Sequence, residues 1–142
     1  MSVLGCTYKY TRAVFKNAKL DPSMQLPGRQ ASIRGWGQEC MSILDVRVTS
    51  TGTPSMQPTL FIGNHMSYLD IPLLCSKAPV VYVAKKELKK WPLFGSAMES
   101  VGTVFVDRSS THSRRGAADE IAPYIKNSGQ SVALFPSGTT TI

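Results

Sequence analysis

A histidine and an aspartate stand five residues apart in the segment PTLFIGNHMSYLD. The apolar run at residues 60–62 predicts a strand and a helix is expected to begin near Asp70, so His65 lies at the turn between them. An imidazole at such a turn can emerge at the edge of a sheet, where its ordinary pKa of about 6.5 makes the neutral base available. If the Asp70 carboxylate holds one ring nitrogen, the other can accept a proton from a hydroxyl. The pair is therefore a candidate His-Asp dyad.

The same pair also has a simpler interpretation. Asp70 can be the N-cap of a helix that carries Pro72 in its first turn, with His65 an ordinary loop residue. The dyad therefore needs support from other parts of the sequence.

Two later strands end in residues suited to binding an anion. In GTVFVDR, a strand would deliver Arg108 to its carboxyl end, the side of an α/β sheet where ligands usually bind, and a guanidinium there can grip a phosphate. In VALFPSGTTT, residues 136–139 can form a tight turn that presents backbone N–H groups and hydroxyls. Taken alone, GTVFVDR is also typical of an exposed strand end, and VALFPSGTTT is also typical of a strand followed by an ordinary turn.

The elements that must position these residues alternate along the chain. Short β-branched or apolar runs predict five strands, at residues 46–49, 60–62, 80–83, 103–106 and 132–135. Helical stretches are expected between them, at residues 71–76, 93–100 and 113–127. Nearly continuous apolar strands that alternate with helices predict an α/β fold, with a mixed, largely parallel sheet covered by helices on both faces.

The chain divides into an N-terminal helical segment, residues 1–44, and an α/β domain, residues 45–142. Within the first segment a weak helical pattern runs over residues 31–44, although Gly35 and Gly37 each lower helix propensity there.

A stronger helical pattern precedes it, at residues 4–19. It places Leu4, Tyr8 and Phe15 on one helical face. The basic side chains beside that face are Lys9, Arg12, Lys16 and Lys19. Such a helix is typical of a membrane interface, but a surface helix that packs its apolar side on the body of the domain gives the same pattern.

The chain of 142 residues carries a net charge of +7, which favours anionic partners. Nucleic acid is not expected among them, because the strands lack the aromatic and basic pattern of single-strand binders. The sequence contains no His, Cys and Asp cluster with metal-ligand spacing and no apolar run of roughly 20 residues, so we expect neither a metal site nor a membrane-spanning helix. Any membrane contact should be peripheral.

The blocks NHMSYLD, GTVFVDR and FPSGTT, with AKKELKKWPLFG between the first two, resemble the first three sequence blocks of the glycerolipid acyltransferase family of the lysophosphatidate type. The resemblance covers residues 45–141 and is to the N-terminal, motif-bearing portion of such enzymes. It implies transfer of a fatty acyl group from acyl-coenzyme A or acyl-carrier protein to the hydroxyl of a lysophospholipid, in phospholipid biosynthesis. It also implies an enzyme without a cofactor that acts peripherally on an anionic membrane surface, at the cytoplasmic face.

Within this resemblance, His65 matches the general base and Asp70 its orienting partner, and Asn64 precedes the base as in the family. The positions that fall in the acceptor-binding blocks are Gly102, Arg108, Ser137, Gly138 and Thr139. The first block offers no obvious nucleophile, which implies direct attack of the acceptor oxygen on the thioester without an acyl-enzyme intermediate.

Two features depart from the family pattern. Ser137 stands where the family usually has Glu, so a carboxylate expected beside the acceptor is missing, which would suit a different head group such as that of a lyso-ornithine lipid. The sequence also ends at Ile142, directly after the third block, so we expect an incomplete α/β domain. These departures leave open a catalytically impaired protein of the same fold that binds lipid or acyl-carrier protein.

Overall fold

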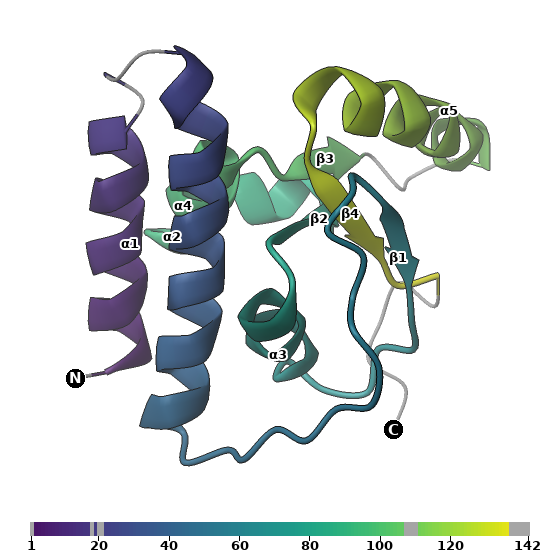
Figure 1. The fold of residues 1–142 in the computed structure, drawn as a ribbon. Coiled ribbons are helices and arrows are strands. Elements are labelled where there is room, and N and C mark those ends of the chain that lie inside the picture. The colour runs from purple at the N-terminus through teal and green to yellow at the C-terminus, as the bar shows by residue number, and fades with distance from the viewer. Residues whose placement is uncertain (1, 18, 20–21, 107–110, 137–142) are drawn as a thin grey trace.

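The α/β domain is built on short parallel strands (Figure 1). The computed structural model describes residues 2–17, 19, 22–106 and 111–136, and the strands within them are β1 (Leu60–Ile62), β2 (Val80–Lys85), β3 (Val104–Val106) and β4 (Ser131–Leu134). They form a 4-stranded sheet in the order β1-β4-β2-β3, and each pairing is parallel. The predicted α/β fold with a largely parallel sheet is confirmed.

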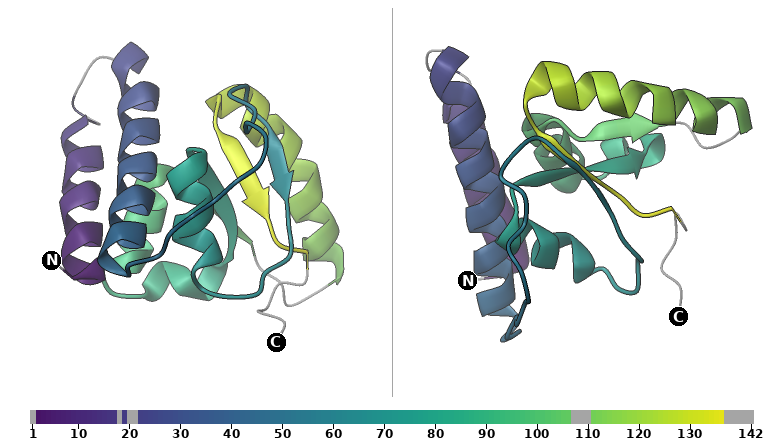
Figure 2. Two further views of the ribbon diagram at one scale, coloured as in Figure 1. Left: turned by 60° about the horizontal axis from the view of Figure 1, so that its bottom comes forward. Right: turned by 45° about the vertical axis from the view of Figure 1, so that its right-hand side comes forward.

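Helices join these strands, because parallel neighbours need a crossover connection. The connecting helices are α3 (Asp70–Lys77), the 3-10 helix η1 (Lys86–Lys90), α4 (Phe94–Val101) and α5 (Thr111–Ser128). Figure 2 shows α5 and α3 on opposite sides of the sheet, so helices cover both faces. The helices predicted at residues 71–76, 93–100 and 113–127 are confirmed.

The hydrophobic core lies where the central strands β2 and β4 meet helices on either side. Its buried residues are Ile33, Cys75, Ala78, Val80, Val81, Ile121, Val132 and Ala133. Both Val132 and Ala133 are at most 1% exposed, since β4 has a strand on each side and a helical layer on each face. This burial explains why the strand reads as an almost continuous apolar run.

The predicted strand at residues 46–49 is wrong. This segment belongs to an extended connection between the N-terminal helices and β1, and no strand of the described residues pairs with it. The Val46 N–H donates instead to the carbonyl oxygen of Met41 at the end of the preceding helix, and Arg47 and Thr49 are exposed. Alternating β-branched residues favour an extended backbone, but a strand also needs a partner for its N–H and C=O groups.

Two helices, α1 (Val3–Asn17) and α2 (Pro22–Ile43), precede the sheet and lie side by side (Figure 1). The second begins nine residues earlier than the predicted range of 31–44, at Pro22, where a proline is tolerated because the first N–H groups of a helix have no intrahelical partner. It packs on α1 along one side and on α3 along the other.

Gly37 permits the contact between α2 and α3. A Cβ atom at this position would lie only 2.4 Å from the backbone nitrogen of Ser76 and 2.6 Å from the carbonyl oxygen of Pro72. The glycine therefore lowers the helix propensity of α2 but lets the two backbones approach closely.

The two faces of α1 differ sharply. Its buried residues are Cys6, Thr7, Thr11 and Val14, which face the rest of the protein. The apolar residues singled out in the sequence, Leu4, Tyr8 and Phe15, are 57%, 55% and 54% exposed, so they do not pack on the body of the domain as a plain surface helix would require. Among the described residues, every helix is too short or too polar to cross a bilayer.

Candidate functional site

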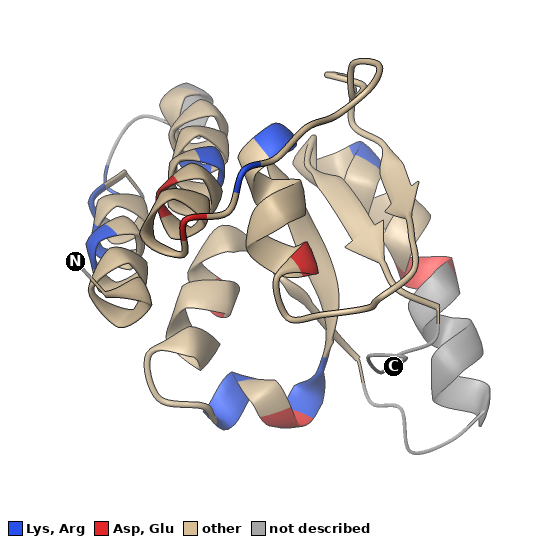
Figure 3. Cartoon of the chain, turned by 90° about the horizontal axis from the view of Figure 1, so that it is seen from below, with Lys and Arg blue, Asp and Glu red and all other residues tan. Residues whose placement is uncertain are grey.

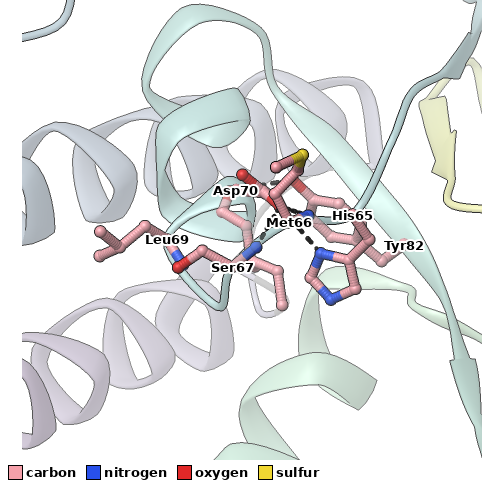
Figure 4. A network of polar contacts seen from close by, with 7 residues as sticks. His65, Met66, Ser67, Leu69, Asp70 and Tyr82 are labelled. Carbon is pink, nitrogen blue, oxygen red and sulfur yellow. Dashed lines mark hydrogen bonds and ion pairs between the residues drawn. The ribbon is translucent and has the colours of Figure 1, made fainter. Parts of the chain in front are cut away.

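β1 delivers His65 to the carboxyl edge of the sheet (Figure 4). After the strand ends, the Gly63 N–H still donates to the carbonyl oxygen of Leu134 in β4, at 3.3 Å. Residues 63–69 then leave the sheet as a loop that enters α3 at Asp70. This is the edge at which α/β sheets usually hold ligands, and the sequence placed His65 at such a turn.

Asp70 ties the loop and the imidazole together through one carboxylate oxygen. Its Oδ2 lies 3.0 Å from Nδ1 of His65 and accepts the backbone N–H groups of Met66 at 2.7 Å and Ser67 at 2.9 Å (Figure 4). The N-cap residue of α3 is Leu69, which makes no side-chain cap hydrogen bond. The simpler interpretation of Asp70 as the N-cap is therefore wrong, since its carboxylate bonds to the loop and to the imidazole.

These contacts set the charge of Asp70. Burial by itself would raise the pKa of Asp70, but hydrogen bonds from the Ser67 N–H, the His65 ring and the Met66 N–H outweigh it and lower that pKa below its usual range. The carboxylate is thus ionised at neutral pH and can only accept, so the proton of a neutral His65 belongs on Nδ1. Nε2 then carries the lone pair, as a general base requires.

Two aromatic rings contact the imidazole of His65. The His65 ring is stacked on Phe135, with centroids 4.5 Å apart and an interplanar angle of 11°, and Tyr68 meets it edge-on at 6.5 Å. Phe135 in turn stacks on Tyr82, at 5.7 Å. No role of Phe135 or Tyr82 was predicted from the sequence, although Phe135 directly precedes the Pro-Ser-Gly turn of the third block.

Of the other predicted site residues, some lie near His65, some lie outside the described residues, and Gly102 lies elsewhere. Asn64 is exposed beside His65 in the same loop. Arg108, Ser137, Gly138 and Thr139 lie outside the described residues, and their roles stay predictions. The strands that precede them, β3 and β4, run parallel to β1, so their described carboxyl ends are on the same edge as His65.

Gly102 is not brought to this edge. It follows α4 and precedes β3, at the amino end of the sheet, in a left-handed conformation with φ of 90°. Its carbonyl oxygen accepts a hydrogen bond from the Tyr124 hydroxyl at 2.5 Å, and a Cβ atom would lie 2.6 Å from that hydroxyl oxygen and 2.9 Å from Gln130 Oε1. The structure thus places Gly102 at the end of α4, on the side of the sheet opposite to His65, and its role in substrate binding stays a prediction.

A group of lysines also lies at the carboxyl edge, where β2 runs into η1 (Figure 3). The exposed members are Lys85, Lys86, Lys89 and Lys90. Lys89 pairs with Glu99 at 2.8 Å, and Glu87 is the only acid within the 3-10 helix itself. The group leaves net positive charge near the site, which attracts anionic molecules at low ionic strength.

An apolar cavity of about 450 Å³ opens next to the loop. It extends between the helix pair α1 and α2 on one side and α3, α4 and the sheet on the other. The lining residues nearest the dyad in sequence are Tyr68, Leu69, Ile71 and Pro72, which flank Asp70. Its volume is in the range of small-molecule sites, and its walls are almost entirely apolar. In the part of the chain that the structure describes, no cluster of His, Cys, Asp and Glu could hold a metal ion.

Known proteins share sequence or fold with this chain. The family model described as Acyltransferase matches residues 45–142. The lyso-ornithine lipid O-acyltransferase of Pseudomonas aeruginosa is 36% identical over 118 residues, which cover 81% of this chain and 44% of that protein. The 1-acyl-sn-glycerol-3-phosphate acyltransferase of Neisseria gonorrhoeae is 28% identical over 116 residues, covering 80% of this chain and 45% of that protein. This chain thus spans less than half the length of these curated relatives.

A solved structure shows the same fold. The crystal structure of the 1-acyl-sn-glycerophosphate acyltransferase of Thermotoga maritima superposes with a TM-score of 0.73 at 24% sequence identity. The match covers 98% of this chain and 61% of that one, so it includes the N-terminal helix pair as well as the sheet.

Asp70 should make the stability of the fold depend on pH. Because its pKa is lowered by folding, the stabilisation is complete above the unfolded pKa of about 3.9 and is lost as the pH falls through that value toward the lower folded one. The difference in unfolding free energy between the wild type and Asp70→Asn should therefore be largest above about pH 5 and shrink below about pH 4. Urea unfolding followed by circular dichroism measures it, with the exposed Glu120→Gln as control. A difference that stays constant down to about pH 3 would contradict the hydrogen-bond arrangement.

Proposed function

The chain belongs to the acyltransferase family, and we propose that it carries the catalytic part of an enzyme that transfers a fatty acyl group from a thioester to a lysophospholipid hydroxyl. The observation that carries this proposal is the His65 imidazole, oriented by an ionised Asp70, beside an apolar cavity. The imidazole can accept the proton of an attacking hydroxyl, and the apolar cavity can hold a hydrocarbon chain.

In the proposed reaction, Nε2 of His65 takes the proton of the acceptor hydroxyl while that oxygen attacks the thioester carbonyl carbon. A C–O bond forms, the C–S bond breaks, and the thiolate leaves with the electron pair of that bond and is protonated by the imidazolium. Asp70 keeps the proton on Nδ1 and stabilises the imidazolium that forms. General base catalysis of this kind typically contributes about 10²- to 10⁴-fold.

Direct transfer fits the thiols of this chain better than a cysteine acyl-enzyme does. All 3 cysteines are free and buried. Burial raises the pKa of Cys40 and of Cys75 to about 12, so neither is a thiolate at neutral pH. We therefore propose that acceptor and donor react with each other in one step, without a covalent link to the protein.

The acceptor is a lysophospholipid-type molecule in this proposal, and the two named relatives differ in it. One is named for lyso-ornithine lipid and one for 1-acyl-sn-glycerol-3-phosphate. The higher identity to the former and the Ser137 in place of the usual Glu both favour a lyso-ornithine-type acceptor. We assign the acceptor head group to the blocks that contain Arg108 and residues 137–139.

The lysines around η1 suit an anionic donor, either the phosphates of acyl-coenzyme A or an acidic acyl-carrier protein. They follow β2 at the carboxyl edge of the sheet, and Leu88 and Trp91, from the same segment, line the cavity. A donor bound there could pass its acyl chain into the cavity while its thioester stays near His65.

Helix α1 is proposed as a peripheral membrane contact within the N-terminal segment, residues 1–44. Its exposed apolar residues alternate in sequence with basic ones, as in helices that lie in a bilayer interface. The residues of this surface are Leu4, Tyr8, Lys9, Arg12, Phe15, Lys16 and Lys19. Binding here would bring the enzyme to its lipid acceptor, at the cytoplasmic face of a membrane.

Replacing His65 tests the reaction. Thiol release from palmitoyl-coenzyme A should depend on an added acceptor, and His65→Ala should lower the acceptor-dependent rate about 10²- to 10⁴-fold. Lyso-ornithine lipid and lysophosphatidate are compared as acceptors, and His112→Ala is the control, because these are the 2 histidines of the chain. Equal rates in wild type and His65→Ala would refute the assignment of the base. Binding of the acceptor by a wild type that releases no thiol would instead indicate a lipid-binding protein.

Narrowing the cavity should change the preferred chain length. Ala97 in α4 lines the cavity, and Ala97→Phe should exclude the end of a long acyl chain. Each methylene left out of the cavity costs about 0.8 kcal/mol, so excluding about three should shift the rate ratio of dodecanoyl- to hexadecanoyl-coenzyme A by at least about 10-fold toward the shorter donor. The exposed Ala122→Phe in α5 is the control. An unchanged ratio in Ala97→Phe would place the acyl chain elsewhere.

Membrane binding by α1 should depend on its charge. The chain should sediment with vesicles that contain phosphatidylglycerol more than with neutral ones, and less so as salt is raised. Lys16→Gln should weaken this binding about 5-fold, because each basic residue near such a surface contributes about 1 kcal/mol. Lys126→Gln removes the same charge from exposed α5 and should have no such effect. Equal losses of vesicle binding in the two variants would indicate that binding depends on the overall charge of the chain and not on a surface of α1.

A further inference from the structure

The Asp70 contact alone does not fix the plane of the His65 ring. The two groups meet through one contact, between Nδ1 and Oδ2 at 3.0 Å. A ring held at one edge can still tilt about that contact, which moves Nε2 on the far side of the ring. A contact on the ring face restricts this tilt and so helps to define where Nε2 points.

Phe135 supplies that second contact. Its ring lies nearly parallel to the imidazole, at 11°, with the centroids 4.5 Å apart, which is the close end of the range for stacked rings. Phe135 directly follows β4, the strand that pairs with β1 ahead of His65. Tyr68 cannot do the same, because it meets the imidazole edge-on at 6.5 Å and is itself 79% exposed.

Phe135 also packs against Tyr82. Tyr82 in β2 stacks on it at 5.7 Å and 21°, and the Tyr82 hydroxyl donates to the carbonyl oxygen of Ile71 at 2.9 Å. Ile71 is the neighbour of Asp70 in the first turn of α3. The contacts therefore connect His65, through Phe135 and Tyr82, back to the first turn of α3 that carries Asp70.

We propose that Phe135 is a positioning residue for His65, which holds the imidazole plane so that Nδ1 meets Asp70 while Nε2 faces the reacting hydroxyl. The inference rests on the proposed function for the role of Nε2, but the packing it describes stands without it. Because small errors in the placement of a base lower the rate of proton transfer, the residue acts on kcat more than on substrate affinity.

The test compares three variants of the full chain. Phe135→Leu removes the ring, Phe135→Tyr keeps it, and Phe61→Leu makes the same change at a partly buried phenylalanine of β1 that packs on the core. Phe135→Leu should lower kcat about 3- to 10-fold with the KM values for donor and acceptor within about 2-fold, Phe135→Tyr should restore most of kcat, and Phe61→Leu should leave it nearly unchanged. An equal loss in Phe61→Leu, or a loss that lies in KM, would overturn the proposal.

A spectroscopic readout separates this inference from the proposed function. The carbon-bound ring protons of His65, assigned with a His112→Gln variant, should resonate upfield because of the Phe135 ring current, and the nitrogen shifts of the ring should report the Nδ1–H tautomer. Phe135→Leu should remove the upfield shift and reduce the share of that tautomer, whereas Phe61→Leu should change neither. If the wild type transfers no acyl group, the proposed function fails, and these spectra alone decide whether Phe135 positions the His65 ring. An unchanged tautomer share in Phe135→Leu would overturn the positioning role.

Discussion

The Oδ2 oxygen of Asp70 accepts the N–H groups of Met66 and Ser67 and contacts Nδ1 of His65, and the geometry of the site depends on this one atom. Three donors around one oxygen fix the loop between β1 and α3 as well as the edge of the imidazole. They also keep the carboxylate ionised against the effect of its burial, because each donor stabilises the charged form. Folding of the loop, the charge of Asp70 and the tautomer of His65 are thus a single arrangement.

The parallel sheet brings segments that are far apart along the chain to one edge. In a parallel sheet all strands end on the same edge, so the described segments that follow β1, β4 and β2 lie along that one edge. The dyad, the lysines of η1 and Phe135 each follow a different strand. The helix pair adds the remaining wall, since α1 and α2 close the apolar cavity against α3 and α4. Gly37 makes this closure possible by letting α2 approach the backbone of α3.

Local signals in the sequence were enough to predict the parallel sheet, its connecting helices and the proximity of His65 and Asp70. Each has a pattern within a few residues: apolar runs mark the strands, turn and capping residues mark the helix ends, and the histidine stands five positions before the aspartate. They failed where the outcome depends on distant partners. Residues 46–49 have the composition of a strand but meet no strand among the described residues. Gly102, whose binding role stays a prediction, has a positive φ and a contact with Tyr124 at the other edge of the sheet, and neither feature has a local signal in the sequence.

The stacked pair of His65 and Phe135 could not be read from the sequence, because the register of the sheet creates it. The two residues are 70 positions apart, and they meet because Ile62 of β1 lies opposite Leu134 of β4. Continued by one residue, as the hydrogen bond from the Gly63 N–H to the Leu134 carbonyl shows, this register sets Phe135 beside the start of the loop that carries His65. A slip of one residue would turn Phe135 to the opposite face of the sheet and remove its ring from the face of the imidazole. The buried apolar residues of β4 oppose such a slip, so the packing of the core also bears on the orientation of the His65 imidazole.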